Sequence, residues 1–343
     1  MNPVKYVQSV FQAFFFWLNN ARYHTWKQSL VPSLLAVLFV SHKETFHLYY
    51  GLLASLGVVL VHMGANLLDD YYDYQCQSVQ KRQMMINGGI RARSFKCHYL
   101  LSGQTTERRL LLVGLSICLA ALLIGVVLWL KWGMPILYFI LAGAFLAFFY
   151  SAPPLRLSFH GLGEITVGIL FGPLVMLGTA WSACGQWDWN VFYLSIPIGL
   201  LVANILYTHS ILDLGPDREA GKNTLAVLLK TQERAVHFSA LLIVAIYFTV
   251  VLGVVCHRVF PTALLVLLSL PLAITLWRFL WIYVREPDRR LERNFWMGPM
   301  EKWELMKKAG LDWFMIRWYL SRNLLSAFCL LLFVSYLLDR WIH

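Results

Sequence analysis

Charged residues are scarce in this sequence, and acidic residues are the scarcest. Only 14% of the 343 residues are charged, with 18 Asp and Glu against 29 Lys and Arg. A typical soluble domain has about 25% charged residues, whereas 59% of this chain is hydrophobic. The composition therefore excludes an ordinary water-soluble enzyme and predicts a single all-α polytopic membrane domain over residues 1–343.

Cysteine is also rare, and no spacing among the six cysteines indicates chemistry. They form no C-x-x-C pair and no metal-binding pattern, and several lie inside apolar stretches. They are therefore predicted to be small apolar packing residues. The N-terminal stretch 11–18 lacks the small-residue cleavage site of a signal peptide, so it is predicted to be an amphipathic helix at the membrane surface.

Nine apolar stretches are candidates for transmembrane helices, although several are shorter than the usual twenty residues. With a cytoplasmic N-terminus, 23 Lys and Arg fall on inside segments and only 4 on outside loops. This asymmetry favours membrane orientation, and not a nucleic-acid partner, as the reason for the net charge of +11. It predicts nine helices in a bacterial cytoplasmic (inner) membrane. The stretches are 26–41, 48–70, 108–130, 135–150, 163–184, 189–212, 237–256, 261–284 and 321–339.

An acidic cluster ends the second apolar stretch, at Asp69, Asp70 and Asp73. Residues three and four apart share one face of a helix, so Asp73 lies beside the other two, with Asn66 one turn earlier. Three carboxylates on one face at a membrane surface repel one another without a cation. The pattern therefore predicts a cation-binding site.

A second acidic cluster, at Asp213 and Asp217, ends the sixth apolar stretch and is predicted to lie on the same cytoplasmic side. Hard oxygen ligands suit Mg²⁺, which is usually held by one or two carboxylates together with substrate phosphates. Two such clusters predict Mg²⁺ bound across a diphosphate.

Four motifs resemble those of one known family. They are DDYYDY at 69–74, YSAPPLR at 150–156, HGLGE at 160–164 and D-x-x-x-D-R-x-A-G-K-x-T-L-A-V at 213–227. Together they resemble the UbiA-type intramembrane prenyltransferases over roughly residues 20–285. The nearest branch transfers a polyprenyl group to 1,4-dihydroxy-2-naphthoate in menaquinone biosynthesis.

The resemblance implies a cavity among nine helices, open to the membrane, with an acidic site on the cytoplasmic side. There Mg²⁺ ionises a polyprenyl diphosphate, and an aromatic acceptor attacks the carbocation. Among the candidate residues, Asp70, Asp73, Asp213 and Asp217 are catalytic and, with Asp69, hold the metal; Lys222, Arg156 and Arg218 contact the diphosphate; Tyr72, Tyr150 and Asn66 stabilise the cation or contact the acceptor.

Two departures from the family pattern affect the ligand set. Gln77 stands where the first motif usually ends in aspartate, and Gly215-Pro216 separates the two acids of the second motif. Proline removes a helical hydrogen bond, so Asp213 and Asp217 are expected to face one site across a bend.

Several alternatives stay open at the level of sequence. The tyrosines also fit an interfacial aromatic belt, the basic residues fit ordinary cytoplasmic charges, and Asn66 fits an interhelical hydrogen bond. The protein could instead act on another acceptor (4-hydroxybenzoate, a glycerol phosphate or a sugar phosphate), or be a lipid or ion transporter.

Outside the resemblance, residues 286–320 contain Trp296, Trp303, Trp313 and Trp318 among many charges. This composition predicts an amphipathic cytoplasmic segment lying on the membrane, followed by the last helix at 321–339.

Overall fold

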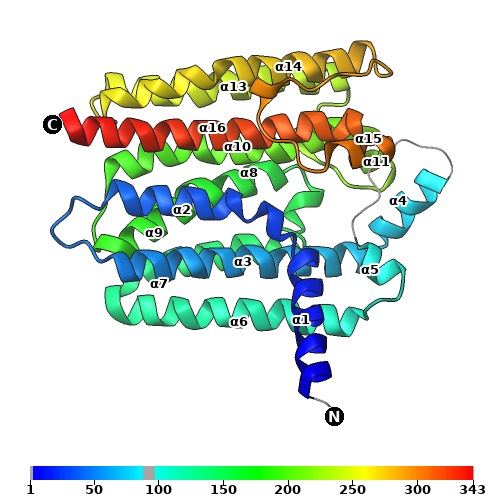
Figure 1. Ribbon diagram of the computed structural model, residues 1–343, viewed down its shortest axis with the longest axis horizontal. Helices are drawn as coiled ribbons and strands as arrows, with labels where there is room; N and C mark the ends of the chain where they lie inside the picture. Colours follow the sequence, from blue (N-terminus) through cyan, green and yellow to red (C-terminus); the bar gives the residue numbers. More distant parts are fainter. Residues whose placement is uncertain (1–2, 88–96, 343) are drawn as a thin grey trace.

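The computed structural model describes residues 3–87 and 97–342, and in that part of the chain the regular structure is helical (Figure 1). The N-terminal half contains α1 (Pro3–Asn20), η1 (Tyr23–Thr25), α2 (Lys27–Phe39), α3 (Leu48–Gln75), α4 (Ser78–Asn87), α5 (His98–Leu101), α6 (Glu107–Trp132), α7 (Met134–Phe149), η2 (Leu157–Phe159), α8 (Gly163–Ile169), the π-helical turn η3 (Leu170–Leu174) and α9 (Val175–Cys184). The C-terminal half contains α10 (Trp189–Leu212), α11 (Leu214–Glu219), α12 (Leu225–Leu228), α13 (Gln232–Val255), η4 (Pro261–Ser269), α14 (Leu270–Arg285), η5 (Phe295–Met297), α15 (Trp303–Lys308) and α16 (Asp312–Ile342).

The predicted all-α membrane fold is confirmed, and a helix occupies each of the nine predicted stretches. Among the described residues, seven helices are long and apolar enough to cross a membrane, and α8, η3 and α9 act as one of them. The remaining two, α2 and α7, have 13 and 16 residues. The count of nine spans stays a prediction.

Helix α10 lies at the centre of the bundle and packs against α8, η3, α13 and α16. It begins where the Asp188 side chain accepts a hydrogen bond from the Val191 backbone, which caps the helix. Its residues Ile198 and Leu201 are completely buried. Burial on all sides explains why this helix is apolar around its whole circumference.

Three glycines let α10 approach α8 and η3 closely. A Cβ on Gly199 would lie 2.4 Å from the carbonyl oxygen of Gly168, and one on Gly172 would lie 2.4 Å from that of Ser195. Small residues at crossings of this kind allow helix backbones to meet in membranes.

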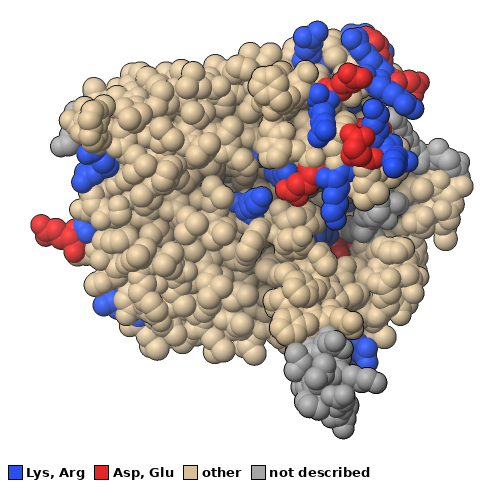
Figure 2. All heavy atoms as spheres, viewed as in Figure 1, with Lys and Arg blue, Asp and Glu red and all other residues tan. Residues whose placement is uncertain are grey.

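Charged side chains gather at one end of the bundle, near α11 and α15, while the apolar flank is almost free of them (Figure 2). The short helices α4 and α5 lie at the same end, and α1 runs across the direction of the long helices (Figure 1). The C-terminus lies at the opposite end. Part of the connection between the second and third predicted stretches, residues 88–96, lies outside the described residues.

The segment 286–320 differs from its prediction. The last helix begins at Asp312 instead of 321, and Trp303, Trp313 and Trp318 are buried in the protein, whereas Trp296 is 42% exposed. Hydrogen bonds from α16 hold part of the segment: Tyr319 donates to the Glu301 carbonyl, and Asn323 donates to the carbonyls of Met297 and Pro299. Most of residues 286–296 are exposed, so an amphipathic segment on the membrane surface stays a prediction.

Candidate active site

One cavity of about 790 Å³ lies at the charged end of the bundle and extends between apolar helices. Its volume is within the range of small-molecule sites. All five aspartates of the two predicted motifs line it, and so do Lys222, Tyr150 and Asn66. The fold thus brings together acids that are at least 140 residues apart in sequence, from α3, from the residue between α10 and α11, and from α11.

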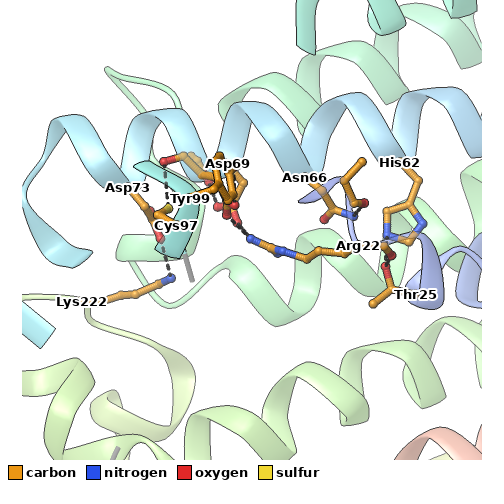
Figure 3. Close-up of polar contacts among 12 residues, drawn as sticks. Arg22, Thr25, His62, Asn66, Asp69, Asp73, Cys97, Tyr99 and Lys222 are labelled. Carbon is orange, nitrogen blue, oxygen red and sulfur yellow. Dashed lines mark hydrogen bonds and ion pairs between the residues drawn. The ribbon is translucent and has the colours of Figure 1, made fainter. Parts of the chain in front are cut away.

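The first acidic motif is paired with Arg22, which lies between α1 and η1 (Figure 3). The Arg22 guanidinium forms a close ion pair with Asp70 and lies 3.4 Å from Asp69. Burial lowers the pKa of Arg22, but the charges of Asp70 and Asp69 more than offset this, so its pKa is raised. The guanidinium therefore supplies a permanent positive charge between two buried carboxylates.

Hydroxyl groups satisfy the remaining oxygens of these carboxylates. Tyr99 of α5 donates a 2.8 Å hydrogen bond to Asp70, and Ser151 donates one to Asp69. Burial and the charge of Asp70 raise the pKa of Tyr99, so the phenol remains a donor at neutral pH. Both carboxylates are thus held in fixed orientations toward the cavity.

Asp73 connects the first motif to the second. Its carboxylate lies 3.9 Å from the Lys222 ammonium, which also lies 5.2 Å from the centre of the Phe159 ring. The Lys222 loop is held by backbone hydrogen bonds, from Lys222 to the Asp217 carbonyl and from Asn223 to the Phe159 carbonyl. The loops that carry the HGLGE and A-G-K motifs therefore lie side by side, with Lys222 next to Asp73.

The second motif lies where one helix ends and a short one begins, and the predicted bend between its two acids stays a prediction. Helix α10 ends at Leu212, and α11 begins at Leu214 with Pro216 in its first turn. The Asp217 backbone donates to the Asp213 carbonyl at 2.8 Å, so the chain continues with one helical turn. Both carboxylates are buried and line the cavity.

Asn66 has a structural contact that explains its position. Its amide donates a 3.1 Å hydrogen bond to the backbone carbonyl of Ala21, next to Arg22, whose φ is 58°. One turn earlier, His62 lies 3.0 Å from the hydroxyl of Ser29. These two contacts hold the segment around Arg22 against helix α3.

Arg22 was not predicted as a site residue. A single arginine before the first apolar stretch resembles any cytoplasmic positive charge, and its partners are 47 and 48 residues away. The ion pairs of Arg22 with Asp69 and Asp70 become visible only in the folded structure, where the segment around Arg22 packs against α3.

Three predicted residues are not among those that line the cavity: Tyr72, Arg156 and Arg218. The Arg218 side chain is exposed and donates to the Lys230 carbonyl at 2.5 Å. Arg156 lies 5.9 Å from the Phe159 ring, and the Tyr72 ring packs 6.1 Å from that of Phe148.

The carboxylates fit Mg²⁺ by their chemistry and position. In residues 3–87 and 97–342, no three acidic, His or Cys side chains form a ready-made metal cage. Mg²⁺ does not need one, because it usually retains waters and takes one or two carboxylates together with phosphates. Five carboxylates on one cavity offer those oxygens from two motifs.

Comparison with known proteins relates this site to a family. The sequence matches the UbiA prenyltransferase family over residues 29–303. It is 31% identical over 170 residues to the 2-carboxy-1,4-naphthoquinone phytyltransferase of Synechocystis sp., a match that spans 49% of this chain and only 55% of that protein. It is 25% identical over 251 residues to the 1,4-dihydroxy-2-naphthoate octaprenyltransferase of Bacillus subtilis, over 73% of this chain and 77% of the relative. The fold is similar, with a TM-score of 0.52 and 15% identity, to a UbiA homolog from Archaeoglobus fulgidus bound to DMAPP and Mg²⁺, over 93% of this chain and 98% of that one.

Proposed function

Because the chain belongs to the UbiA prenyltransferase family, we propose that it transfers a polyprenyl group from an allylic diphosphate to 1,4-dihydroxy-2-naphthoate, a step of menaquinone biosynthesis. The observation that carries the proposal is the convergence of two acidic motifs on one otherwise largely apolar cavity. This arrangement suits a substrate with a charged head and a hydrocarbon tail.

The acids and bases of the cavity have complementary tasks. Asp70, Asp73, Asp213 and Asp217 would hold Mg²⁺, which neutralises charge on the departing diphosphate. Lys222 lines the same cavity and donates to a diphosphate oxygen, because its ammonium is oriented by Asp73 and by the Phe159 ring.

Aromatic and aliphatic side chains would contact the hydrocarbon chain of the prenyl donor. Phe139, Phe148 and Tyr150 line the cavity, and their ring faces stabilise an allylic cation without offering a strong nucleophile. Leu115 and Leu122 of α6 line it as well and suit an isoprenoid chain. Excluding water from this part protects the cation from hydrolysis.

The acceptor is proposed from the relatives. The Bacillus relative is named a 1,4-dihydroxy-2-naphthoate octaprenyltransferase, and the Synechocystis relative is a phytyltransferase for a naphthoquinone carboxylate. A donor diphosphate with Mg²⁺ is supported by the Archaeoglobus structure, which binds DMAPP and Mg²⁺. We place the site on the cytoplasmic side of a bacterial inner membrane, with the N-terminus inside.

The test is a product assay with purified protein in detergent, Mg²⁺ and a long-chain prenyl diphosphate. Separate reactions contain 1,4-dihydroxy-2-naphthoate, 4-hydroxybenzoate or geranylgeranylglyceryl phosphate, and products are identified by mass. We expect a prenylated product that has lost the carboxyl group, from the naphthoate alone. A product from another acceptor alone would refute the naphthoate, and no product from any acceptor would refute prenyl transfer.

Two variants test the role of the acids in the same assay. Asp73→Asn and Asp217→Asn should each lower turnover by at least about a hundredfold, because each removes a charge that faces the diphosphate. Excess chelator should abolish parent activity. Near-normal turnover in either variant, with unchanged protein yield, would contradict the proposed mechanism.

A further inference from the structure

The cavity follows α3 for most of the length of that helix, which runs along the bundle (Figure 1). Residues of α3 line the cavity at every turn from Ala54 to Asp73, so the cavity lies along one face of the helix. Asp69 follows Ala54 by 15 residues, which is about 22 Å at a rise of 1.5 Å per residue. The cavity therefore extends about 22 Å from the first acidic motif toward the opposite end of the bundle.

Apolar side chains of α6 and α7 complete this long part of the cavity. The lining from α6 runs from Leu115 to Leu128, and the lining from α7 runs from Ile136 to Phe148. Both helices are described in full, and neither contributes a charged side chain to the lining. This part of the cavity therefore suits a hydrocarbon chain.

Three buried residues form the end wall of the cavity, at the end far from the acids. Ala54, Leu128 and Ile136 line the cavity and together make a small apolar cluster, in which each is between 2% and 6% exposed. Ser182 lines the cavity as well, and its hydroxyl donates to the Gly178 carbonyl at 2.8 Å. Among the described residues of α3, none before Ala54 reaches the cavity.

Aromatic rings support the end wall from behind. Tyr50, Trp132 and Trp181 pack against the cluster and are not among the residues that line the cavity. The Tyr50 and Trp132 rings lie 6.1 Å apart, centre to centre, and the Lys131 ammonium lies 5.4 Å and 5.2 Å from their centres. A Cβ on Gly185 would lie 2.2 Å from the Trp132 ring, so this ring is closely packed. The end wall is therefore a packed structure and not a loose end of the cavity.

The distance from the acids to the end wall corresponds to a prenyl chain of limited length. Each isoprene unit adds four carbon–carbon bonds of about 1.5 Å, or about 5 Å to an extended chain. The space between Asp69 and Ala54 therefore holds about four to five isoprene units. A longer chain cannot extend past the end wall, so its last units must leave the cavity sideways.

We propose that Ala54, Leu128 and Ile136 set the preferred length of the prenyl donor at about four to five isoprene units, an inference that rests on the proposed prenyl transfer. A shorter donor leaves part of the cavity unfilled and loses van der Waals contacts there. A longer donor must bend away from the end wall. Packing at the end wall supplies the selection, because lipid is as apolar as the cavity and a hydrophobic gain alone does not discriminate between chains.

The test is a competition between donors of different length. Purified protein in detergent receives Mg²⁺, 1,4-dihydroxy-2-naphthoate and equal amounts of farnesyl, geranylgeranyl, farnesylgeranyl, hexaprenyl and octaprenyl diphosphates, and the products are quantified by mass. The ratio of products does not depend on the amount of folded protein, so it can be compared between variants with different yields.

Two variants change the end wall in opposite directions. Ala54→Phe fills the last part of the cavity, and Leu128→Ala enlarges it. Leu52→Phe and Leu119→Ala are matched controls on the same two helices, because Leu52 and Leu119 are 47% and 56% exposed and are not among the lining residues.

We expect the parent to use geranylgeranyl and farnesylgeranyl diphosphates most. Ala54→Phe should move the maximum to farnesyl diphosphate and lower the share of farnesylgeranyl product at least about tenfold, because a misfit of one carbon in an apolar pocket already changes selectivity by about 10–200-fold. Leu128→Ala should move the maximum toward hexaprenyl diphosphate. Both controls should keep the product ratio of the parent.

The outcomes separate this inference from the proposed function. A parent without a preferred length, a parent maximum at octaprenyl diphosphate, or a maximum that neither Ala54→Phe nor Leu128→Ala moves would overturn the role of the end wall and leave prenyl transfer intact. Equal shifts in the two controls would also overturn it, because they indicate a general change in helix packing. No product from any donor would refute the proposed function itself, and the role of the end wall with it.

Discussion

Replacing Arg22 with leucine should destabilise the protein and make its stability depend on Mg²⁺. In the structure Arg22 lies between Asp69 and Asp70, whose carboxylates are buried, while the arginine side chain is 30% exposed. Removing one partner of a fully buried pair costs about 3–5 kcal/mol, and the partial exposure of Arg22 reduces this to about 2–3 kcal/mol because solvent screens the charges. For a chain of this length the loss corresponds to a fall in Tm of about 3–5 °C.

The measurement is thermal unfolding in detergent, with and without Mg²⁺. Two adjacent carboxylates without their arginine should bind Mg²⁺ more strongly, so the metal should restore part of the lost stability. Arg285→Leu is the control, because its ion pair with Glu233 is exposed on both sides and is worth less than about 1 kcal/mol. The reasoning is refuted if Arg22→Leu unfolds at the same temperature as the parent, or if Mg²⁺ stabilises both proteins equally.

Two further predictions concern the bundle itself. Gly199→Ala should lower Tm by several degrees, because the new methyl group would lie 2.4 Å from the Gly168 carbonyl oxygen, whereas Gly143→Ala on α7 meets open space and should leave Tm unchanged or slightly higher. A Tm unchanged by Gly199→Ala would mean that the helices are not in close contact there. Reporter fusions at His343 and after Ser102 should report opposite sides of the membrane, and the same side would refute an odd number of spans.

The fold class and the acidic motifs were predictable from sequence because both depend on local patterns. Apolar stretches mark helices, and the spacing of Asp69, Asp70 and Asp73 places them on one helical face regardless of tertiary structure. All five acids line one cavity, as the prediction of a shared site requires.

The other residues of the site come from segments that are far apart in sequence and meet only in the folded protein. No local sequence pattern predicts such contacts. Arg22 resembled an ordinary cytoplasmic charge, and Trp318 resembled part of a surface segment, yet both line the cavity. Conversely, Tyr72 belongs to a motif but is not among the lining residues. The last helix begins earlier than predicted, at Asp312, and its first turns carry Arg317 and Arg322 into the bundle. Arg317 is buried against backbone carbonyls, and Arg322 lies over aromatic rings.

The length of α3 fixes the depth at which the chemistry takes place. Leu48 begins this helix at the end far from the acids, and Asp70 lies about 33 Å further along it at 1.5 Å per residue. The hydrocarbon layer of a bilayer is about 30 Å thick. A helix of this length standing across the bilayer from Leu48 would bring the carboxylates of the first motif to the level of the lipid headgroups, where the proposed prenyl diphosphate donor would carry its charge. In the proposed reaction the donor would enter with its charged head in the polar layer and its tail in the hydrocarbon layer, so binding it would require lateral movement only, without transfer of a phosphate into hydrocarbon.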